Sequence, residues 1–433
     1  MRKNSLSSHK KAQKAHKLKA VFCLVCLLCL FVATIRAQSP EVVQLFEQIA
    51  TLIRDNRLPE AEKELNEILR ASPDMPVAVN LLGTIRAKQN RLVEAEALFL
   101  RALKQDDKFT GARMNLVYLY LLKRTPDKAI LQLNEVLALE PDNVEARVVL
   151  GDAYLAKNDL QKAEENYLAA LDGRLDNAGA LFGLAQISRL KGETKEPMLF
   201  LNRVATLIAD SKSDDFLYKF ALEAMRVNMF DEAKSALQRA VELRPQEPTY
   251  LLALGIAWLR KTDLFEAEKL FRRVLEIQPG NAQAQLHLGY VLLIQKKPAE
   301  ARTWLEKSGR SGVVIPEVSY YLGLVAQEQG DDPRAIVLFQ KAVQQLPSYV
   351  HARVALGATY LRLKDYVRAR KELETAVKID PEEPSGHYNL ALLYARTKEP
   401  ARAQEQMKIV EDLKSKQRTS SGGLVLPPTS TPQ

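Results

Sequence analysis

The sequence is poor in the residues that build reactive centres. It has three cysteines and five histidines in 433 residues, and all three cysteines lie within residues 23–29. Residues 38–433 therefore cannot form a disulfide, a thiolate metal site or a cysteine nucleophile. The histidines in that part, His287, His351 and His387, never share a helical turn. They leave little material for a metal cluster or a catalytic dyad.

A general excess of positive charge is also lacking outside the N-terminus. The formal net charge is +9, but residues 1–36 contain eight Lys or Arg and no acidic residue. The remainder has 54 basic and 53 acidic residues, so it is nearly neutral. A protein that binds nucleic acid through the phosphates needs a basic patch or stripe. The charge balance therefore predicts no nucleic-acid partner.

Signatures of catalysis are missing as well. The sequence contains no P-loop and no Gly-x-Gly-x-x-Gly fingerprint. Its many Asp and Glu residues alternate with Lys and Arg, as on solvated helix faces. No long segment remains from which a separate catalytic domain could be built. We therefore predict a protein without enzymatic activity and without a cofactor or metal.

The first 37 residues are typical of an export signal. Residues 1–19 are polar and positive, and residues 20–34 are apolar and uncharged. A basic region, a short apolar region and a small residue before the cut define a secretory signal peptide. We expect cleavage after Ala37 and a periplasmic or extracellular body. The alternative is an uncleaved anchor through residues 20–35, with the body facing out of the cytoplasm.

What the sequence has in abundance is a pattern repeated every 34 residues. Counted from Val350, one unit has Leu356 at position 7, Gly357 at 8, Tyr360 at 11, Ala369 at 20, Ala376 at 27 and Pro381 at 32. This layout resembles the tetratricopeptide repeat (TPR) family, with its L-G-x2-Y…A…A…P pattern. Units begin at residues 42, 76, 110, 144 and 178 and, after a slip of two residues, at 214, 248, 282, 316, 350 and 384. The resemblance implies an all-α, right-handed solenoid of about eleven helix–turn–helix repeats.

The recurring positions have a physical reason. Position 8 is Gly or Ala in nine units, and position 20 is Ala in every unit except the one with Pro197. We expect these small residues where the two helices of a repeat cross closely, with Leu at position 7 and larger residues at position 24 beside the crossing. Overfilling such a contact costs about 1–3 kcal/mol. Proline at position 32 should end the second helix.

Two units depart from the pattern. Unit five (178–213) has Pro197 in place of Ala and a polar stretch at Asp210–Asp215. In unit eight, Gly309 and Gly312 should shorten the second helix. Either departure can be tolerated drift in a redundant array or a hinge, and we favour unit five as the stronger joint.

The predicted domain organisation follows from these irregularities. Units one to five form residues 42–212, and units six to eleven form residues 213–417. A leader of residues 1–37 precedes them. Residues 418–433 are polar and rich in Ser, Thr, Gly and Pro, so we expect a disordered tail.

The family resemblance also implies a binding groove. In TPR proteins the first helices line a concave groove into which positions 2, 5, 9 and 12 point. On this basis the partner-binding residues are Tyr118, Asp152, Phe182, Gln186, Tyr218, Leu286, Tyr290, Tyr320, Gln327 and Tyr388. Further groove positions are Leu252, Ile256, Leu324 and Leu392, with polar edges at Asn80, Arg189, Glu317 and His351. The alternative is that residues at positions 5 and 9 pack against the adjacent unit.

The function expected from this resemblance is binding of protein or peptide partners. The Lys/Asn set of the carboxylate-clamp TPR proteins does not occur in any three consecutive units, so capture of an acidic chain terminus is not expected. We expect an adaptor of the cell envelope that helps assemble a secretion, pilus, polysaccharide-export or outer-membrane complex. One alternative is a signal-anchored scaffold of the inner membrane. Another is an enzyme hidden in units five and eight.

Overall fold

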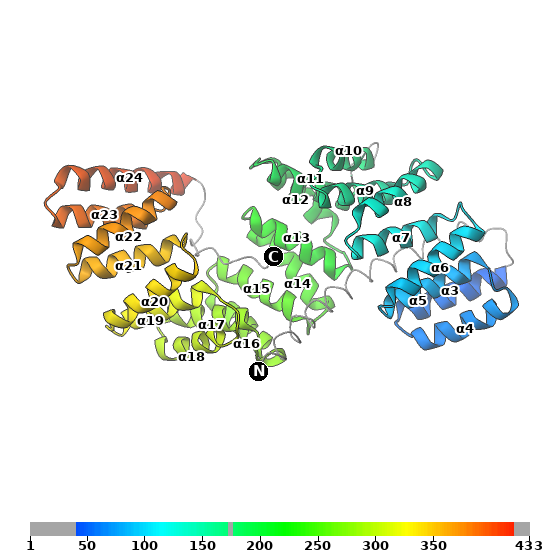
Figure 1. Ribbon diagram of the computed structural model, residues 1–433, viewed down its shortest axis with the longest axis horizontal. Coiled ribbons are helices and arrows are strands. Elements are labelled where there is room, and N and C mark those ends of the chain that lie inside the picture. The colour runs from blue at the N-terminus through cyan, green and yellow to red at the C-terminus, as the bar shows by residue number, and fades with distance from the viewer. Residues whose placement is uncertain (1–39, 172–175, 420–433) are drawn as a thin grey trace. The chain divides into compact units, whose positions relative to one another are not determined.

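The structure is a computed structural model that describes residues 40–171 and 176–419, and these residues form helices without any strand. They fold into two compact units, Met1–Ser211 (unit 1) and Lys212–Gln433 (unit 2). In each unit, successive helices pair and the pairs stack along the chain (Figure 1). The predicted all-α repeat architecture is confirmed. The expected leader and tail lie outside the described residues.

Unit 1 contains five helix pairs in its described part. They are α3 (Pro40–Arg54) with α4 (Leu58–Ala71), α5 (Pro76–Lys88) with α6 (Leu92–Gln105), α7 (Thr110–Leu122) with α8 (Pro126–Leu139), α9 (Val144–Ala156) with α10 (Leu160–Leu171), and α11 (Ala178–Leu190) with α12 (Glu196–Leu207). Each odd-numbered helix is the first helix of its repeat. Each even-numbered helix is the second.

Unit 2 contains six pairs in its described part. They are α13 (Asp214–Arg226) with α14 (Phe230–Leu243), α15 (Pro248–Arg260) with α16 (Leu264–Ile277), α17 (Ala282–Ile294) with α18 (Pro298–Gly309), α19 (Pro316–Glu328) with α20 (Asp332–Gln345), α21 (Val350–Arg362) with α22 (Tyr366–Ile379), and α23 (Pro384–Arg396) with α24 (Pro400–Thr419). Among the described residues, no helix is both long and apolar enough to cross a bilayer.

Short polar residues and prolines start many of these helices. Asn143, Asn177 and Asn281 cap first helices, each accepting a hydrogen bond from the backbone N–H three residues on. Asp263 and Asp365 do the same for second helices. Such caps satisfy N–H groups that have no partner within the helix and contribute about 1 kcal/mol each.

The turn between the paired helices has one conformation throughout. The residue at position 15 has a φ between +57° and +81° in all eleven repeats. Gly or Asn, which accept this left-handed region, occupies six of these turns, but Arg124, Thr262, Lys296, Lys364 and Lys398 occupy the others. The backbone N–H at position 16 bonds to a carbonyl oxygen of the first helix, as Asp365 does to Tyr360 at 2.9 Å. The repeat geometry therefore overrides residue preference at these turns.

The expected close crossing of the two helices is confirmed. A Cβ atom added at Gly255 would lie 2.6 Å from a ring carbon of Phe271, and one added at Gly323 would lie 2.4 Å from Phe339. These rings are the position-24 residues of the same repeats. Alanine at position 20 is fully buried in nine repeats, for example Ala267. Each aromatic residue at position 24 thus requires a glycine at position 8.

Charged side chains connect successive repeats, although the sequence suggested solvated helix faces. A Glu at position 21 hydrogen-bonds to the residue at position 14 of the next repeat, 27 residues later. The pairs are Glu62 with Gln89, Glu96 with Lys123, Glu164 with Lys191, and Glu268 with Gln295. These bonds recur because stacking brings the same two positions together in each repeat.

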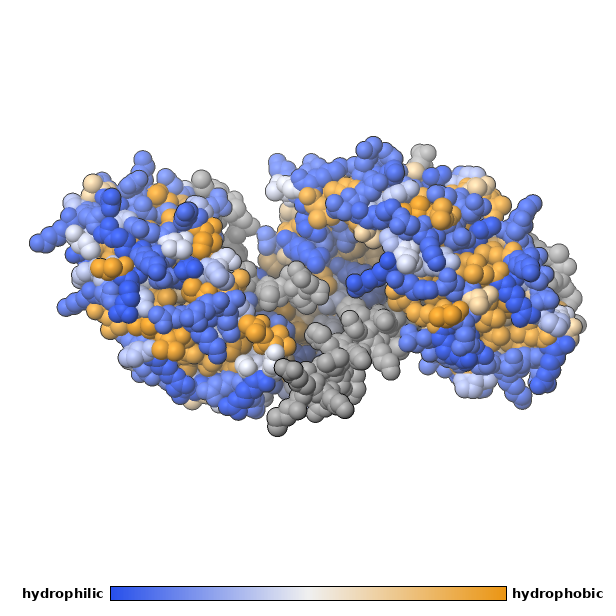
Figure 2. Space-filling model, in the orientation of Figure 1, coloured by the Kyte–Doolittle hydropathy of each residue, from blue (hydrophilic) through white to orange (hydrophobic). Residues whose placement is uncertain are grey.

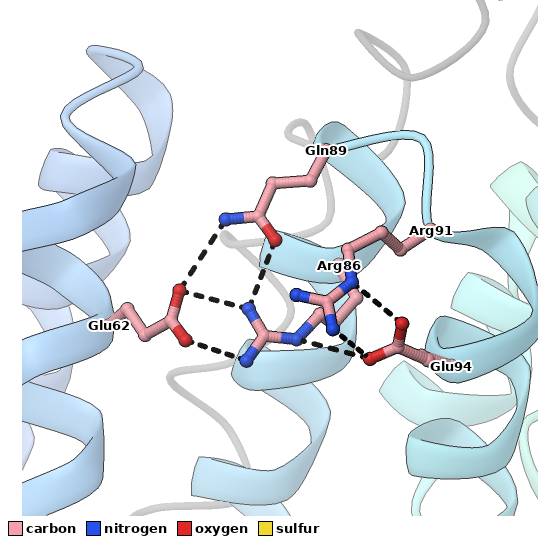
Figure 3. Close-up of polar contacts among 5 residues, drawn as sticks. All are labelled: Glu62, Arg86, Gln89, Arg91 and Glu94. Carbon is pink, nitrogen blue, oxygen red and sulfur yellow. Dashed lines mark hydrogen bonds and ion pairs between the residues drawn. The ribbon is translucent and has the colours of Figure 1, made fainter.

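The most extensive of these contacts surrounds Arg86 in unit 1 (Figure 3). Arg86 replaces the tyrosine expected at position 11, and its guanidinium lies 2.6 Å from Glu62 of the preceding repeat. It also donates to Gln89 and pairs with Glu94, which in turn pairs with Arg91. The hydrogen bond from Arg86 lowers the pKa of Glu62. Three helices, α4, α5 and α6, are held together by this network.

The two irregular repeats keep the helix pair. Pro197 is buried at the start of α12, where the missing N–H has no cost. In the eighth repeat (residues 282–315), α18 ends at Gly309 after 12 residues, whereas α16 and α20 have 14 residues. The predicted shortening of this second helix is confirmed. Val313 and Val314 in the turn that follows are exposed.

Candidate protein-binding surface

The first helices of consecutive repeats lie against one another within each unit, as α9 does with α11 and α17 with α19. We call the surface that they form the first-helix face of the unit. All ten residues predicted to bind a partner lie on first helices. Four are in unit 1 and six are in unit 2.

In unit 1 the predicted residues are spread over three helices. Tyr118 on α7 donates a hydrogen bond to Glu145 on α9 at 2.8 Å, which links two repeats. Asp152 on α9 is exposed and accepts a 2.6 Å hydrogen bond from Tyr167. Phe182 and Gln186 on α11 are half-buried. Tyr118 and Asp152 thus have structural partners in addition to exposed surface.

In unit 2 the structure brings four tyrosines together, which we call the tyrosine cluster: Tyr290, Tyr320, Tyr321 and Tyr349. The rings of Tyr290 on α17 and Tyr321 on α19 have centroids 4.8 Å apart. Tyr320 lies 5.3 Å from both Tyr321 and Tyr349. Tyr290 and Tyr320 are half-buried, whereas Tyr321 and Tyr349 are almost completely buried. The cluster is therefore a partly exposed aromatic surface supported by buried rings.

Two buried polar groups at this cluster have no hydrogen bond in the part of the chain that the structure describes. The Tyr349 hydroxyl and the Glu317 Oε2 atom are both buried, and neither has a hydrogen bond among the described residues. Burial raises the pKa of all four tyrosines, that of Tyr290 to about 12. The hydroxyls therefore stay protonated at neutral pH and can donate.

The other predicted residues of unit 2 differ in exposure. Tyr388 on α23 is 45% exposed. Tyr218 is half-buried with its ring 5.0 Å from that of Tyr250. Gln327 on α19 donates to the Thr359 hydroxyl on α21 at 2.7 Å. Tyr388 is the most open aromatic side chain among the predicted residues of this face.

Three expected groove residues are buried and need correction. Leu286 is 2% exposed, so its side chain belongs to the core of unit 2 and offers no surface to a partner. Asn80 is also 2% exposed, and its side-chain oxygen accepts a hydrogen bond from Asn115 at 2.9 Å. Glu317 is 5% exposed. Family positions predict which helix face a residue occupies, but neighbouring side chains decide whether solvent reaches it.

Three residues of this surface were missed by sequence reasoning. Tyr321 is at position 6 and Tyr349 at position 34, outside the four groove positions carried over from the family. Arg260 is at position 13, the last residue of α15, and is half-buried. The adjacent tyrosines in SYYLG were a usable signal, since two neighbouring aromatics on one helix cannot both face the same way.

Two of the histidines, His287 and His387, have structural roles. His287 is buried and stacks on Phe271 at 5.3 Å between centroids, and its burial lowers its pKa to about 4. His387 bonds through its two ring nitrogens to Gln406 and to the carbonyl oxygen of Pro381. Within residues 40–171 and 176–419, no three His, Cys, Asp or Glu residues are grouped as metal ligands.

The face of the molecule shown in Figure 2 is mainly hydrophilic in both units, with apolar residues exposed in separate patches. Second helices contribute some of the exposed apolar side chains, such as Phe265 on α16, which is 74% exposed. Exposure of an apolar side chain alone therefore does not distinguish the two faces. The first-helix face of unit 2 differs because its aromatics form a cluster with unpaired polar groups.

Comparison with known proteins gives distant relatives. The chain is 22% identical over 340 residues to human protein O-mannosyl-transferase TMTC3, and this alignment covers 77% of this chain and 30% of the relative. It is 26% identical over 284 residues to cellulose synthase operon protein C of Xanthomonas axonopodis pv. citri (strain 306), and this alignment covers 64% of this chain and 17% of the relative. The chain thus spans less than a third of the length of either relative.

Solved structures also align with this chain. A structure of the APC/C hetero-tetramer Cut9–Hcn1 aligns with a TM-score of 0.44 and 14% identity, covering 86% of this chain and 94% of that one. Yeast Tom70 aligns with a TM-score of 0.43 and 15% identity, and the alignment covers 88% of this chain and 96% of that one.

Family models match most of the chain. Two models described as tetratricopeptide repeat match residues 47–108, 114–176, 150–211, 218–282 and 266–312, and residues 326–392. The matched segments agree with the helix pairs, the left-handed turns and the glycine crossings described above. The chain therefore belongs to the tetratricopeptide repeat family, whose fold generally serves as a scaffold for protein interaction.

Proposed function

We propose that this protein is an exported, non-enzymatic scaffold that binds partner polypeptides on the first-helix face of unit 2. Its work would be the assembly of a secretion, pilus, polysaccharide-export or outer-membrane complex in the cell envelope. The tyrosine cluster is the observation that carries this proposal. The leader composition of residues 1–37 supports export. A relative named cellulose synthase operon protein C supports a role in the envelope.

The chemistry of the face suits a polypeptide. Tyr290, Tyr320 and Tyr388 each present a ring and a hydroxyl from a helix whose backbone is fixed by the repeat. Tyrosine gives a large contact area with few rotatable bonds, and a few such anchors carry most of the energy of an interface. An extended segment or a helix laid along the first helices would contact several of them at once.

Export leaves two states of the N-terminus. If residues 1–37 are removed, the scaffold is free in the periplasm or outside the cell. If residues 20–35 remain as an anchor, it is held at the membrane with its repeats outside the cytoplasm. N-terminal sequencing of the protein from fractionated cells separates these two, and a cytoplasmic full-length protein would contradict export.

Photocrosslinking in the native cell tests the binding face. A benzophenone amino acid is placed at Tyr388, on a first helix of unit 2, and in a matched variant at Phe265, on a second helix. Both side chains are open and aromatic, so the probe perturbs folding equally little. We expect a discrete protein adduct from position 388 and none from position 265. Adducts from position 265 alone would show that partners bind elsewhere.

A further inference from the structure

The first helices of unit 2 end repeatedly in arginine. Position 13 is Arg226 in α13, Arg260 in α15, Arg362 in α21 and Arg396 in α23. Three of them have a partner: Arg226 pairs with Glu223, Arg362 pairs with Asp332, and Arg396 donates to the carbonyl oxygen of Leu361. Arg260 forms no hydrogen bond or ion pair with any residue that the structure describes. Every other half-buried arginine in the described ranges has a partner.

The sequence explains why Arg260 is unpaired. Arg362 pairs with Asp332, thirty residues before it in the preceding repeat. The residue thirty places before Arg260 is Phe230, which cannot accept a hydrogen bond. Burial without a carboxylate lowers the pKa of Arg260. A guanidinium that is partly removed from water and left unpaired is costly unless another molecule supplies the anion.

The helix packed against the end of α15 carries a hydrogen-bond donor. The helix α15, which ends at Arg260, lies against α17. Tyr290 on α17 is half-buried, and its hydroxyl bonds to no residue within the described ranges. A guanidinium and a phenolic O–H on neighbouring helices are suited to a carboxylate, which accepts several charge-assisted hydrogen bonds.

We infer that Arg260, with the hydroxyl of Tyr290, binds the carboxylate of an Asp or Glu side chain within the partner polypeptide. This inference rests on the proposed function, because it names the residue type that the partner must carry on that face. Charge complementarity is the reason for a carboxylate. Arginine and phenols can also bind phosphate, which the test below separates.

Selection from a random twelve-residue peptide library displayed on phage tests this assignment on the full-length protein. We expect the selected sequences to share an Asp or Glu at one position. Replacing that residue by Asn or Gln in the synthetic peptide should weaken binding about tenfold or more. The substitution Arg260→Gln should weaken binding of the acidic peptide by the same factor. Selection on the Arg260→Glu variant should give peptides with Lys or Arg at the same position.

Matched variants distinguish a specific contact of Arg260 with the peptide from a general effect of removing a positive charge. Arg362→Gln removes an arginine at the same repeat position that is already paired, so it should leave affinity for the acidic peptide unchanged. Tyr290→Phe keeps the ring but removes the hydroxyl, so it should weaken binding of the acidic peptide severalfold. Circular dichroism checks that each variant folds. If Arg260→Gln does not fold, the Tyr290→Phe variant still tests the site.

The outcomes separate the two levels of the proposal. Selected peptides that bind without any acidic preference would overturn the role of Arg260 and leave the binding face intact. A second outcome is that inorganic phosphate binds tightly to the wild type but not to Arg260→Gln, while the peptides show no acidic preference. This result would overturn the assignment of a carboxylate as the ligand of Arg260. If no peptide is selected by wild type or variants, the proposed function itself fails.

Discussion

The contact between Gly255 and Phe271 offers a quantitative test of how the repeats are locked. A methyl group added at Gly255 would lie 2.6, 3.0 and 3.1 Å from three ring carbons of Phe271. The ring cannot easily move, because it is fully buried and stacked against His287. Overpacking of this kind costs about 1–3 kcal/mol. Helix propensity returns about 1 kcal/mol, so Gly255→Ala alone should lose up to about 2 kcal/mol.

A double-mutant cycle removes the propensity term. Leucine at position 24 already faces alanine at position 8 in the pairs Ala185–Leu201 and Ala221–Leu237, which are buried. Phe271→Leu alone should cost about 1–2 kcal/mol through the lost ring volume. Where glycine occupies position 8, the leucines Leu305 and Leu373 lie 2.6 Å from an added Cβ atom. In the double variant the flexible leucine should therefore shift to the place that Leu201 and Leu237 take beside alanine. We expect a coupling energy of about 1–2 kcal/mol in favour of the double variant.

Urea unfolding of the full-length protein measures this coupling. The protein has two tryptophans, Trp258 and Trp304, and both lie in unit 2. Trp258 is on the same helix as Gly255, so its fluorescence follows this repeat. A coupling energy within about 0.3 kcal/mol of zero would show that the two side chains are independent. The steric explanation of the glycine pattern would then be refuted.

Two further predictions concern stability. Burial lowers the pKa of His287 in the folded protein from the ordinary 6.5 to about 4, so the unfolded protein binds more protons between these pH values. Stability should be complete above about pH 6.5 and should fall as the pH is lowered towards 4, by about 3 kcal/mol at most. His287→Gln should flatten that slope in urea titrations at several pH values, and an unchanged slope would contradict the assignment. Thr262 has a φ of +63°, so Thr262→Gly should stabilise the protein by about 0.5–1 kcal/mol. The control Asn228→Gly should be nearly neutral in the same thermal melts, and equal gains would show that left-handed strain is not the cause.

The fold could be predicted from the sequence because several positions of each repeat serve one contact. Glycine at position 8, alanine at position 20 and a large residue at position 24 all meet where the two helices cross, as Gly255, Ala267 and Phe271 do. A chance match to three such positions in one unit is common. The same phase kept over eleven units is not.

The binding face could be predicted only in part. The position of Tyr388 on a first helix followed from the repeat number, but the burial of Leu286 at the same position 5 did not. Whether a side chain is open depends on the sizes of its neighbours in adjacent repeats, which a positional rule ignores. The pairing of charges is equally non-local. Arg260 and Arg362 occupy the same position, but the residue thirty places earlier is Phe230 for one and the ion-pair partner Asp332 for the other.

Hydrogen–deuterium exchange with a selected peptide bound tests most directly that partners occupy the first-helix face of unit 2. Amides at the ends of α15, α17 and α19 nearest Arg260 and the tyrosine cluster should gain protection, because a bound segment covers them. The second helices α16, α18 and α20 should exchange as in the free protein. Protection confined to the second helices, or unchanged exchange throughout unit 2 under saturating peptide, would contradict the account.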